Sequence, residues 1–174
     1  GVKVWGETCP QYVTLTAADM DRPGFEGAKY MCSPAPRDAA EHERVWEMIR
    51  RGTLDVVTSD HCGFSFQGPH GKRSSGEDAP FRDIPNGIPG FAARMPIIFS
   101  EGVAKGRITL DHFVRLTSTN AARLMGLYPR KGAIMVGSDA DLVLWDPTAR
   151  KTLTNAMMQH AIDYTPYEGM DITG

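Results

Sequence analysis

The sequence predicts an α/β fold built on a parallel sheet. An amphipathic helix is expected at residues 39–51, and a β-branched strand at residues 54–59 follows it directly after Gly52. The strand is apolar almost throughout, which is typical of parallel strands covered on both faces. A helix that leads straight into such a strand is one αβ unit of a parallel sheet. Asp60 then stands at the carboxyl end of the strand, where α/β proteins collect ligand-binding and catalytic groups.

The composition indicates a globular protein whose partner is a small molecule. The 174 residues are 41% hydrophobic and 23% charged, a balance typical of folded soluble chains. A net charge of −2 provides no basic surface for nucleic acid or an anionic membrane. No apolar run approaches the roughly 20 residues of a membrane-spanning helix. Three cysteines without a C-x-x-C pair argue against a disulfide framework and for a reducing, cytoplasmic setting.

The N-terminal third is expected to contain a strand, a loop and the entry to the helix. A short strand is predicted at residues 2–5 and is ended by the segment before Pro10, which lacks a backbone donor. Prolines keep residues 30–37 extended. Asp38 then fits the N-cap of the helix, with Glu41 three residues later completing a pattern like a capping box.

Residues 64–89 form a long segment rich in glycine, proline and serine, without a useful hydrophobic period. A loop of about 25 residues is uncommon in compact domains unless it serves as a lid or a binding loop. It starts beside Asp60, so a functional role is expected.

Helices dominate the part that follows the loop. A helical segment is predicted at residues 91–105, in which Pro96 either introduces a kink or marks the true start. Thr109 can cap a short helix, and Thr117 or Ser118 can cap the next one.

A change in character near residue 127 suggests a domain boundary. Residues 133–136 and 141–145 have the composition of strands, separated by a glycine turn. The second unit, residues 128–174, is too small to bury a core without help from other parts of the chain. Two units are therefore expected, at residues 1–127 and 128–174.

The residues themselves leave the chemistry partly open. A buried carboxylate needs either a hydrogen-bond network or a cation, so Asp60 could be structural or functional. His61 follows it on the opposite face of the strand, and a structural role is expected for it. Cys9 and Cys62 have no histidine at a diagnostic spacing and are interpreted as small apolar groups rather than nucleophiles.

Ser33 and Asn86 both lie in irregular backbone beside prolines. Such backbone offers free N–H and C=O groups to a ligand. On the residues alone, however, ordinary turn chemistry is the simpler interpretation of both.

Seven blocks of sequence point to a known family when they are taken in their order along the chain. The blocks are residues 7–12, 33–37, 58–62, 84–87, 117–122, 128–132 and 137–142. Together they resemble the dihydropyrimidinase/D-hydantoinase family of cyclic amidohydrolases. The resemblance implies an α/β fold, the C-terminal part of a (β/α)8 TIM-like amidohydrolase barrel plus part of a small β-sandwich domain. Residues 1–127 would be about the last two β/α units, and residues 128–174 the returning strands of the sandwich.

The same resemblance implies roles for individual residues. The family has a binuclear metal centre, usually zinc, and opens hydantoin or dihydropyrimidine rings to N-carbamoyl amino acids. Asp60 matches its aspartate ligand, which is also the general base. The segments of Ser33 and Asn86 match those whose backbone groups bind the cyclic amide or ureide, which replaces the turn interpretation of both. The family is usually tetrameric.

The chain departs from the family pattern in what it lacks. The H-x-H pair, the carboxylated lysine and two further histidine ligands have no counterpart in it. The chain is therefore expected to be a fragment cut at both ends and inactive alone. The alternative is a non-enzymatic dihydropyrimidinase-like scaffold protein. Asp60 discriminates between them, because such relatives tend to lose this carboxylate.

Overall fold

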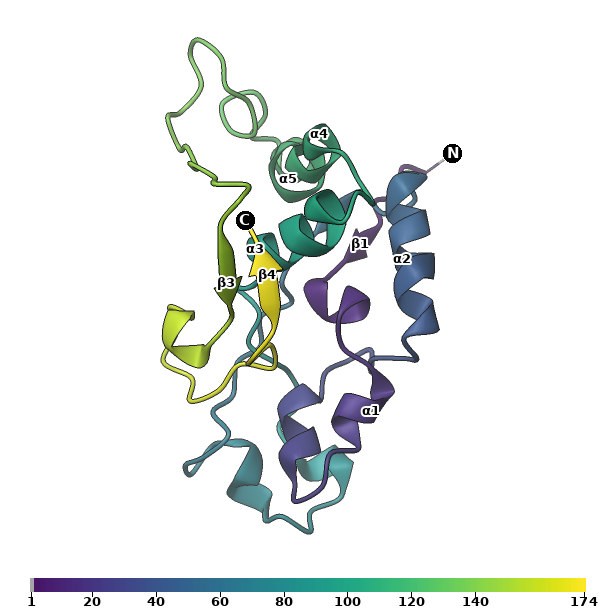
Figure 1. Ribbon diagram of the computed structural model, residues 1–174, viewed down its shortest axis with the longest axis vertical. Helices are drawn as coiled ribbons and strands as arrows, with labels where there is room; N and C mark the ends of the chain where they lie inside the picture. Colours follow the sequence, from purple (N-terminus) through teal and green to yellow (C-terminus); the bar gives the residue numbers. More distant parts are fainter. Residues whose placement is uncertain (1) are drawn as a thin grey trace.

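The computed structural model describes residues 2–174 as short helices and strands joined by long irregular segments (Figure 1). The strands are β1 (Glu7–Thr8), β2 (Val56–Val57), β3 (Arg150–Thr152) and β4 (Asp171–Thr173). The α-helices are α1 (Ala17–Met20), α2 (Ala40–Arg50), α3 (Arg94–Ile98), α4 (Leu110–Val114) and α5 (Asn120–Leu124). Turns of 3₁₀ helix lie at Pro10–Val13, Glu26–Tyr30, Lys72–Ser75, Phe81–Asp83 and Asn155–Met157, and π-helical turns at Phe99–Ala104 and Arg115–Thr119.

The parallel pairing predicted for the apolar strand is confirmed. β2 pairs in parallel with β1, with Glu7 opposite Val56 and Thr8 opposite Val57. Both valines of β2 are buried. The strand leaves the sheet just before Asp60, which therefore lies at the carboxyl end of β2 as expected.

The strand predicted at residues 2–5 is wrong. Val2 and Val4 are exposed, and β1 begins only at Glu7. Backbone hydrogen bonds from the β2 segment extend towards the N-terminus only as far as Gly6, whose carbonyl accepts from the amides of residues 55 and 56. Residues 2–5 therefore stay outside the sheet, because their alternating apolar side chains do not replace backbone pairing with another strand.

The predicted helix before β2 is confirmed as α2, whose Trp46 is 0% exposed. Gly52, at φ +72°, follows the helix in the left-handed conformation that favours glycine. The cap assigned to Asp38 is wrong: Ala39 is the N-cap, and no side chain caps this end. Because Ala39 already has helical dihedral angles, Asp38 lies one residue too early and contributes only its carbonyl, to the amide of Glu41.

The helix predicted at residues 91–105 begins at Arg94 and runs through α3 and the π-helical turn that follows. Pro96 lies in its first turn, where a missing N–H removes no intrahelical bond. The interpretation of Pro96 as marking the helix start is the correct one.

The cap at Thr109 is confirmed, since its hydroxyl accepts from the amide of His112 at 3.2 Å. The second cap, at Thr117 or Ser118, is wrong, because α4 continues through a π-helical turn into α5. The Thr117 hydroxyl instead donates to the Phe113 carbonyl at 2.8 Å, a bond made inside a helix.

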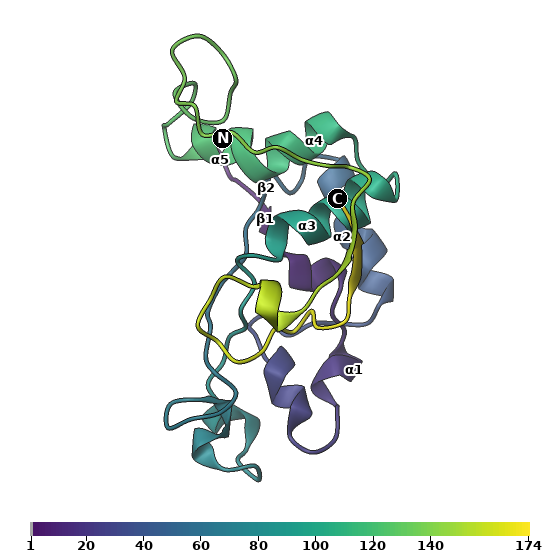
Figure 2. The ribbon, with the colours of Figure 1, turned by 60° about the vertical axis from the view of Figure 1, so that its left-hand side comes forward.

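Helix α3 lies beside strand β4 (Figures 1 and 2). Its Ile97 joins an apolar cluster with Leu153 and Ile172 of the C-terminal segment. The neighbouring Ile98 joins a second cluster with Trp46 of α2. A single helix therefore links the two halves of the core. None of the helices within residues 2–174 is long and apolar enough to cross a membrane.

The strands predicted at residues 133–136 and 141–145 are wrong. Both stretches are irregular and belong to the projecting loop, residues 125–149 between α5 and β3, which extends from one end of the molecule (Figure 1). Ile134 is 89% exposed and Leu144 is 98% exposed. β3 and β4 follow this loop as an antiparallel pair, with Arg150 opposite Thr173. The β-branched residues of the loop lie beside no strand within residues 2–174.

Candidate functional site

Asp60 is exposed at the end of β2 and has a φ of +44°, an uncommon conformation for a residue other than glycine. Strained backbone of this type occurs often at functional sites. Asp60 lines a cavity of about 490 Å³ together with Cys9, Tyr12 and Pro34. Within residues 2–174, no hydrogen bond or ion pair engages its carboxylate.

The charge of Asp60 affects the groups around this cavity. Burial raises the pKa of Cys9 to about 11, and the negative charge of Asp60 adds to the shift. The same two causes raise the pKa of Cys32 to about 11. Burial also raises the pKa of Tyr12. Both thiols stay protonated at neutral pH, which argues against Cys9 as a nucleophile, because the thiolate is the reactive form.

Ser33 and Asn86, 53 residues apart in sequence, meet in the structure. The Asn86 side-chain amide donates to the Ser33 hydroxyl at 2.6 Å. One residue further on, the Gly87 amide donates to the Met31 carbonyl at 3.0 Å. The two irregular segments predicted to hold a ligand therefore form one joined surface.

Pro34 connects this surface to Asp60. Pro34 lines the same cavity as Asp60, and its carbonyl accepts from the Tyr12 hydroxyl at 3.0 Å. Ser33 directly precedes Pro34 in the chain. The structure thus places Ser33, Asp60 and Asn86 on segments that lie next to one another, although the three residues are far apart in the sequence.

His61 has the structural role that the sequence predicts. Its Nδ1 accepts from the amides of Gly90 and Phe91, both at 3.3 Å, next to the start of α3. The bonds anchor the end of the long loop. His61 therefore supports the fold, whereas the neighbouring Asp60 faces the cavity.

Two residues near the site were not expected from the sequence. Lys72 is 0% exposed, although it lies in a polar, glycine-rich loop where a lysine is normally solvated. Arg94 donates to the carbonyl of Val57 at 2.9 Å, at the last residue of β2. Neither position carries a hydrophobic period or a motif that could have identified it.

The chemistry of Asp60 fits one ligand of a divalent metal ion. A carboxylate oxygen is among the usual ligands of zinc, and this one is exposed to the cavity. Residues 2–174 contain no group of three or more His, Cys, Asp or Glu side chains placed to hold a metal. A free carboxylate at this position can bind a cation or accept a proton.

Asp60 lies at the carboxyl end of a parallel strand, the end at which α/β barrels place their catalytic and ligand-binding groups. Residues 15–170 match the model of the amidohydrolase family, and the chain belongs to that family.

The chain is also similar to individual members of the family. It is 47% identical over 174 residues to a D-hydantoinase from Geobacillus stearothermophilus, and 46% identical to one from Rhizobium radiobacter. The crystal structure of a dihydropyrimidinase from Brevibacillus agri superposes with a TM-score of 0.92 at 47% identity, over 98% of this chain.

These matches confirm the resemblance to the dihydropyrimidinase/D-hydantoinase family. The two D-hydantoinase matches cover 100% of this chain but only 36% and 37% of those proteins, and the dihydropyrimidinase structure matches 98% of this chain with 36% of its own. The chain thus spans about a third of the length of these relatives. That this third is the C-terminal one stays a prediction.

Proposed function

We propose that the protein containing this chain is a metal-dependent hydrolase of cyclic amides. It would open hydantoin or dihydropyrimidine rings to N-carbamoyl amino acids. The observation that carries the proposal is the carboxylate of Asp60 at the end of β2, which has no partner within residues 2–174, lies beside a cavity, and belongs to a chain 47% identical to a D-hydantoinase. The substrate would be a small cyclic amide or ureide.

Asp60 has two roles in the proposed reaction. It would be one of the ligands of a pair of divalent metal ions, with zinc as the proposed metal. When bound, such ions lower the pKa of a water molecule and polarise a carbonyl group. Asp60 accepts the proton of the attacking water as the new C–O bond forms. It then returns this proton to the ring nitrogen as the C–N bond breaks.

The joined surface of Ser33 and Asn86 is the proposed binding site for the ring. Its backbone groups lie in irregular segments, outside helix and sheet ladders, and can bond to the polar edge of a cyclic amide. The hydrogen bond between the two side chains keeps the segments together. This surface orients the ring, whereas Asp60 acts on the proton.

A non-enzymatic scaffold protein of the same fold is the alternative. The carboxylate of Asp60 favours the enzyme, because a scaffold gains nothing from an exposed, strained acid at the end of a strand. Three further properties are proposed. The family resemblance suggests a homo-tetrameric assembly, the cysteine usage a cytoplasmic location, and the change in character near residue 127 two units at residues 1–127 and 128–174.

The deciding experiment uses the full-length protein loaded with zinc. Turnover of hydantoin and dihydrouracil is expected for the wild type. Asp60→Ala should lower kcat by about 10³-fold or more, since both a general base and a metal ligand are removed. Asp139→Ala changes an exposed acid that pairs with Lys131 in the projecting loop, and serves as the matched control. A rate close to that of the wild type in folded Asp60→Ala would refute the role of Asp60.

The 174-residue chain by itself should not turn over either ring, because it would contribute only one of the ligands that the resemblance implies. Hydrolysis of hydantoin by the purified chain with stoichiometric zinc would overturn this expectation. Ring-opening is measured by the release of the N-carbamoyl amino acid.

A further inference from the structure

Lys72 is a lysine with no exposed surface, at the start of a 3₁₀ turn in the long loop. Its ammonium group forms no ion pair within residues 2–174. It donates instead to the carbonyl of Pro85 at 2.9 Å and to the carbonyl of Met31 at 3.5 Å. A buried ammonium without a carboxylate is costly, so these two carbonyls are its main compensation.

Both carbonyls belong to the segments that form the proposed ring-binding surface. Pro85 precedes Asn86, and Met31 lies two residues before Ser33. The Met31 carbonyl also accepts from the amide of Gly87. Lys72 therefore joins the two segments from the buried side, while the Asn86–Ser33 bond joins them on the exposed side.

The geometry of the peptide bond gives this contact a direction. The Pro85 carbonyl and the Asn86 N–H belong to one trans peptide unit, in which they point in opposite directions. Because Lys72 fixes the carbonyl on the buried side, the Asn86 N–H faces away from Lys72. This N–H meets no acceptor within residues 2–174, so it is free to bond to a ligand.

We propose that Lys72 is a positioning residue for the cyclic substrate: its ammonium group fixes the Pro85 and Met31 carbonyls, and so aims the backbone of the Ser33–Asn86 surface at the ring. The inference rests on the proposed function for the identity of the ligand. The contact between Lys72 and the two carbonyls is independent of it. Lys72 does not touch the ring and takes no part in the proton transfer.

The test compares Lys72→Met with the wild type in the full-length, zinc-loaded protein. Methionine keeps the approximate length and volume but has no donor. KM for hydantoin should rise about tenfold, the effect of losing one hydrogen bond of about 1.4 kcal/mol. kcat should change less than threefold, and the metal content should stay the same. Lys151→Met, at an exposed position of β3, is the control and should leave KM unchanged.

Hydrogen exchange supplies a readout that needs no substrate. The Gly87 amide, which donates to the Met31 carbonyl, should exchange about tenfold faster in Lys72→Met, because one of the two bonds that hold this carbonyl is lost. Lys72→Gln keeps a side-chain N–H donor and should retain more ring affinity than Lys72→Met.

The outcomes separate the two proposals. Absence of ring turnover in the wild type would refute the proposed function, and the exchange of Gly87 would still decide whether Lys72 holds the segments. Wild-type turnover together with an unchanged KM in folded Lys72→Met would refute the positioning role alone. Failure of both Lys72 variants to fold would also overturn it, since Lys72 would then support the fold rather than the site.

Discussion

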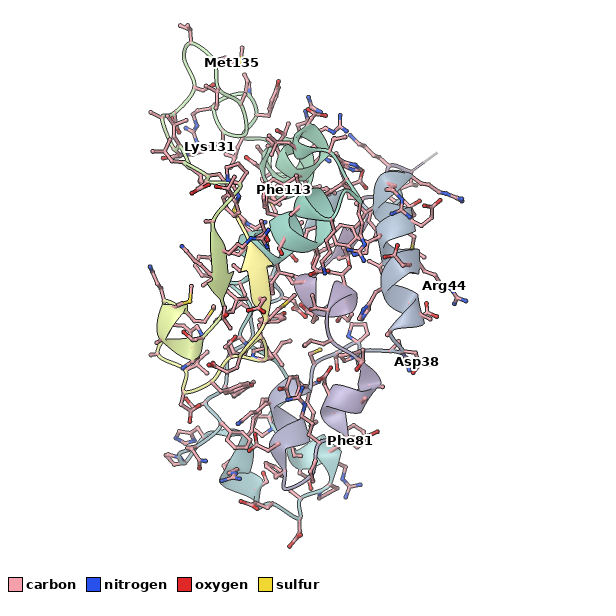
Figure 3. All side chains as sticks on the ribbon, in the orientation of Figure 1. Asp38, Arg44, Phe81, Phe113, Lys131 and Met135 are labelled. Carbon is pink, nitrogen blue, oxygen red and sulfur yellow. The ribbon has the colours of Figure 1, made fainter. Side chains whose placement is uncertain are left out.

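Two stretches of similar composition adopt different structures in this protein, one as a buried strand and the other as an exposed loop. Residues 54–57 and residues 133–136 are both rich in β-branched and aliphatic side chains. The first stretch contains β2, whose Val57 is 1% exposed, and the second lies in the projecting loop around Met135 (Figure 3). The backbone of β2 pairs with that of β1, whereas residues 133–136 lie beside no strand within residues 2–174. Strand propensity is realised only where another strand supplies the ladder.

The comparison extends to charged groups. Lys72 is enclosed and meets only carbonyls, and burial lowers its pKa to about 8. Lys131, in the projecting loop, pairs with Asp141 and Asp139, which raise its pKa. The folded protein would be more stable if Lys72 were neutral, whereas the charge of Lys131 stabilises it. The charge of a lysine therefore destabilises the fold at the enclosed position and stabilises it at the exposed one.

The largest expected difference concerns packing. Trp46→Ala should lower the free energy of unfolding of the 174-residue chain by about 3–5 kcal/mol, because it leaves a cavity in the core. Leu144→Ala should change it by less than about 0.5 kcal/mol, since that side chain already faces solvent. Urea unfolding followed by circular dichroism measures both. Similar losses in the two variants would show that the loop is packed as firmly as the core.

A second difference concerns pH. The folded-state pKa of Lys72 is lowered from 10.5 to about 8, so the cost of charging it is fully present below pH 8 and disappears towards pH 10.5. Wild-type stability relative to Lys72→Met should therefore increase by about 3 kcal/mol between pH 7 and pH 10.5. Urea unfolding of both proteins at several pH values measures it. A difference that does not vary with pH would contradict the lowered pKa.

Lys131 provides the opposite case for the same experiment. Its folded-state pKa is raised, so its contribution to stability is present below pH 10.5 and is lost as the pH rises above that value. Lys131→Met should therefore become less harmful at higher pH. The change should be small, because exposed ion pairs are screened by solvent. A pH dependence of the same sign for both lysines would remove the contrast between the two regions.

The smallest expected effect concerns a helix end. Thr109→Ala removes the hydroxyl that accepts from the His112 amide and should lower the free energy of unfolding by about 1 kcal/mol. Ser138→Ala removes an exposed hydroxyl bond to the Pro129 carbonyl in the projecting loop and should have a smaller effect. Thermal unfolding of both variants tests the order. The reverse order would indicate that the loop contributes more than its exposure suggests.

The sequence predicted those features of the fold that rest on local patterns. The helix before β2, its glycine stop, the Thr109 cap and the parallel strand ending near Asp60 are all present. The errors at Asp38, at residues 2–5 and at residues 133–136 and 141–145 have two causes. A cap depends on the exact residue at which the helix starts, and a strand depends on a partner that the local sequence does not contain.

For the candidate site, the sequence alone determined that Asp60 follows a buried strand and that Ser33 and Asn86 lie in irregular backbone. Only the tertiary structure decided that Asn86 bonds to Ser33 and that Lys72 is enclosed beneath the two segments. The reason is physical: apolar periodicity and turn residues act over a few neighbours, whereas these contacts join residues 13 to 53 positions apart. A lysine in a polar loop gives no local sign of being buried, because burial is a property of the surrounding fold.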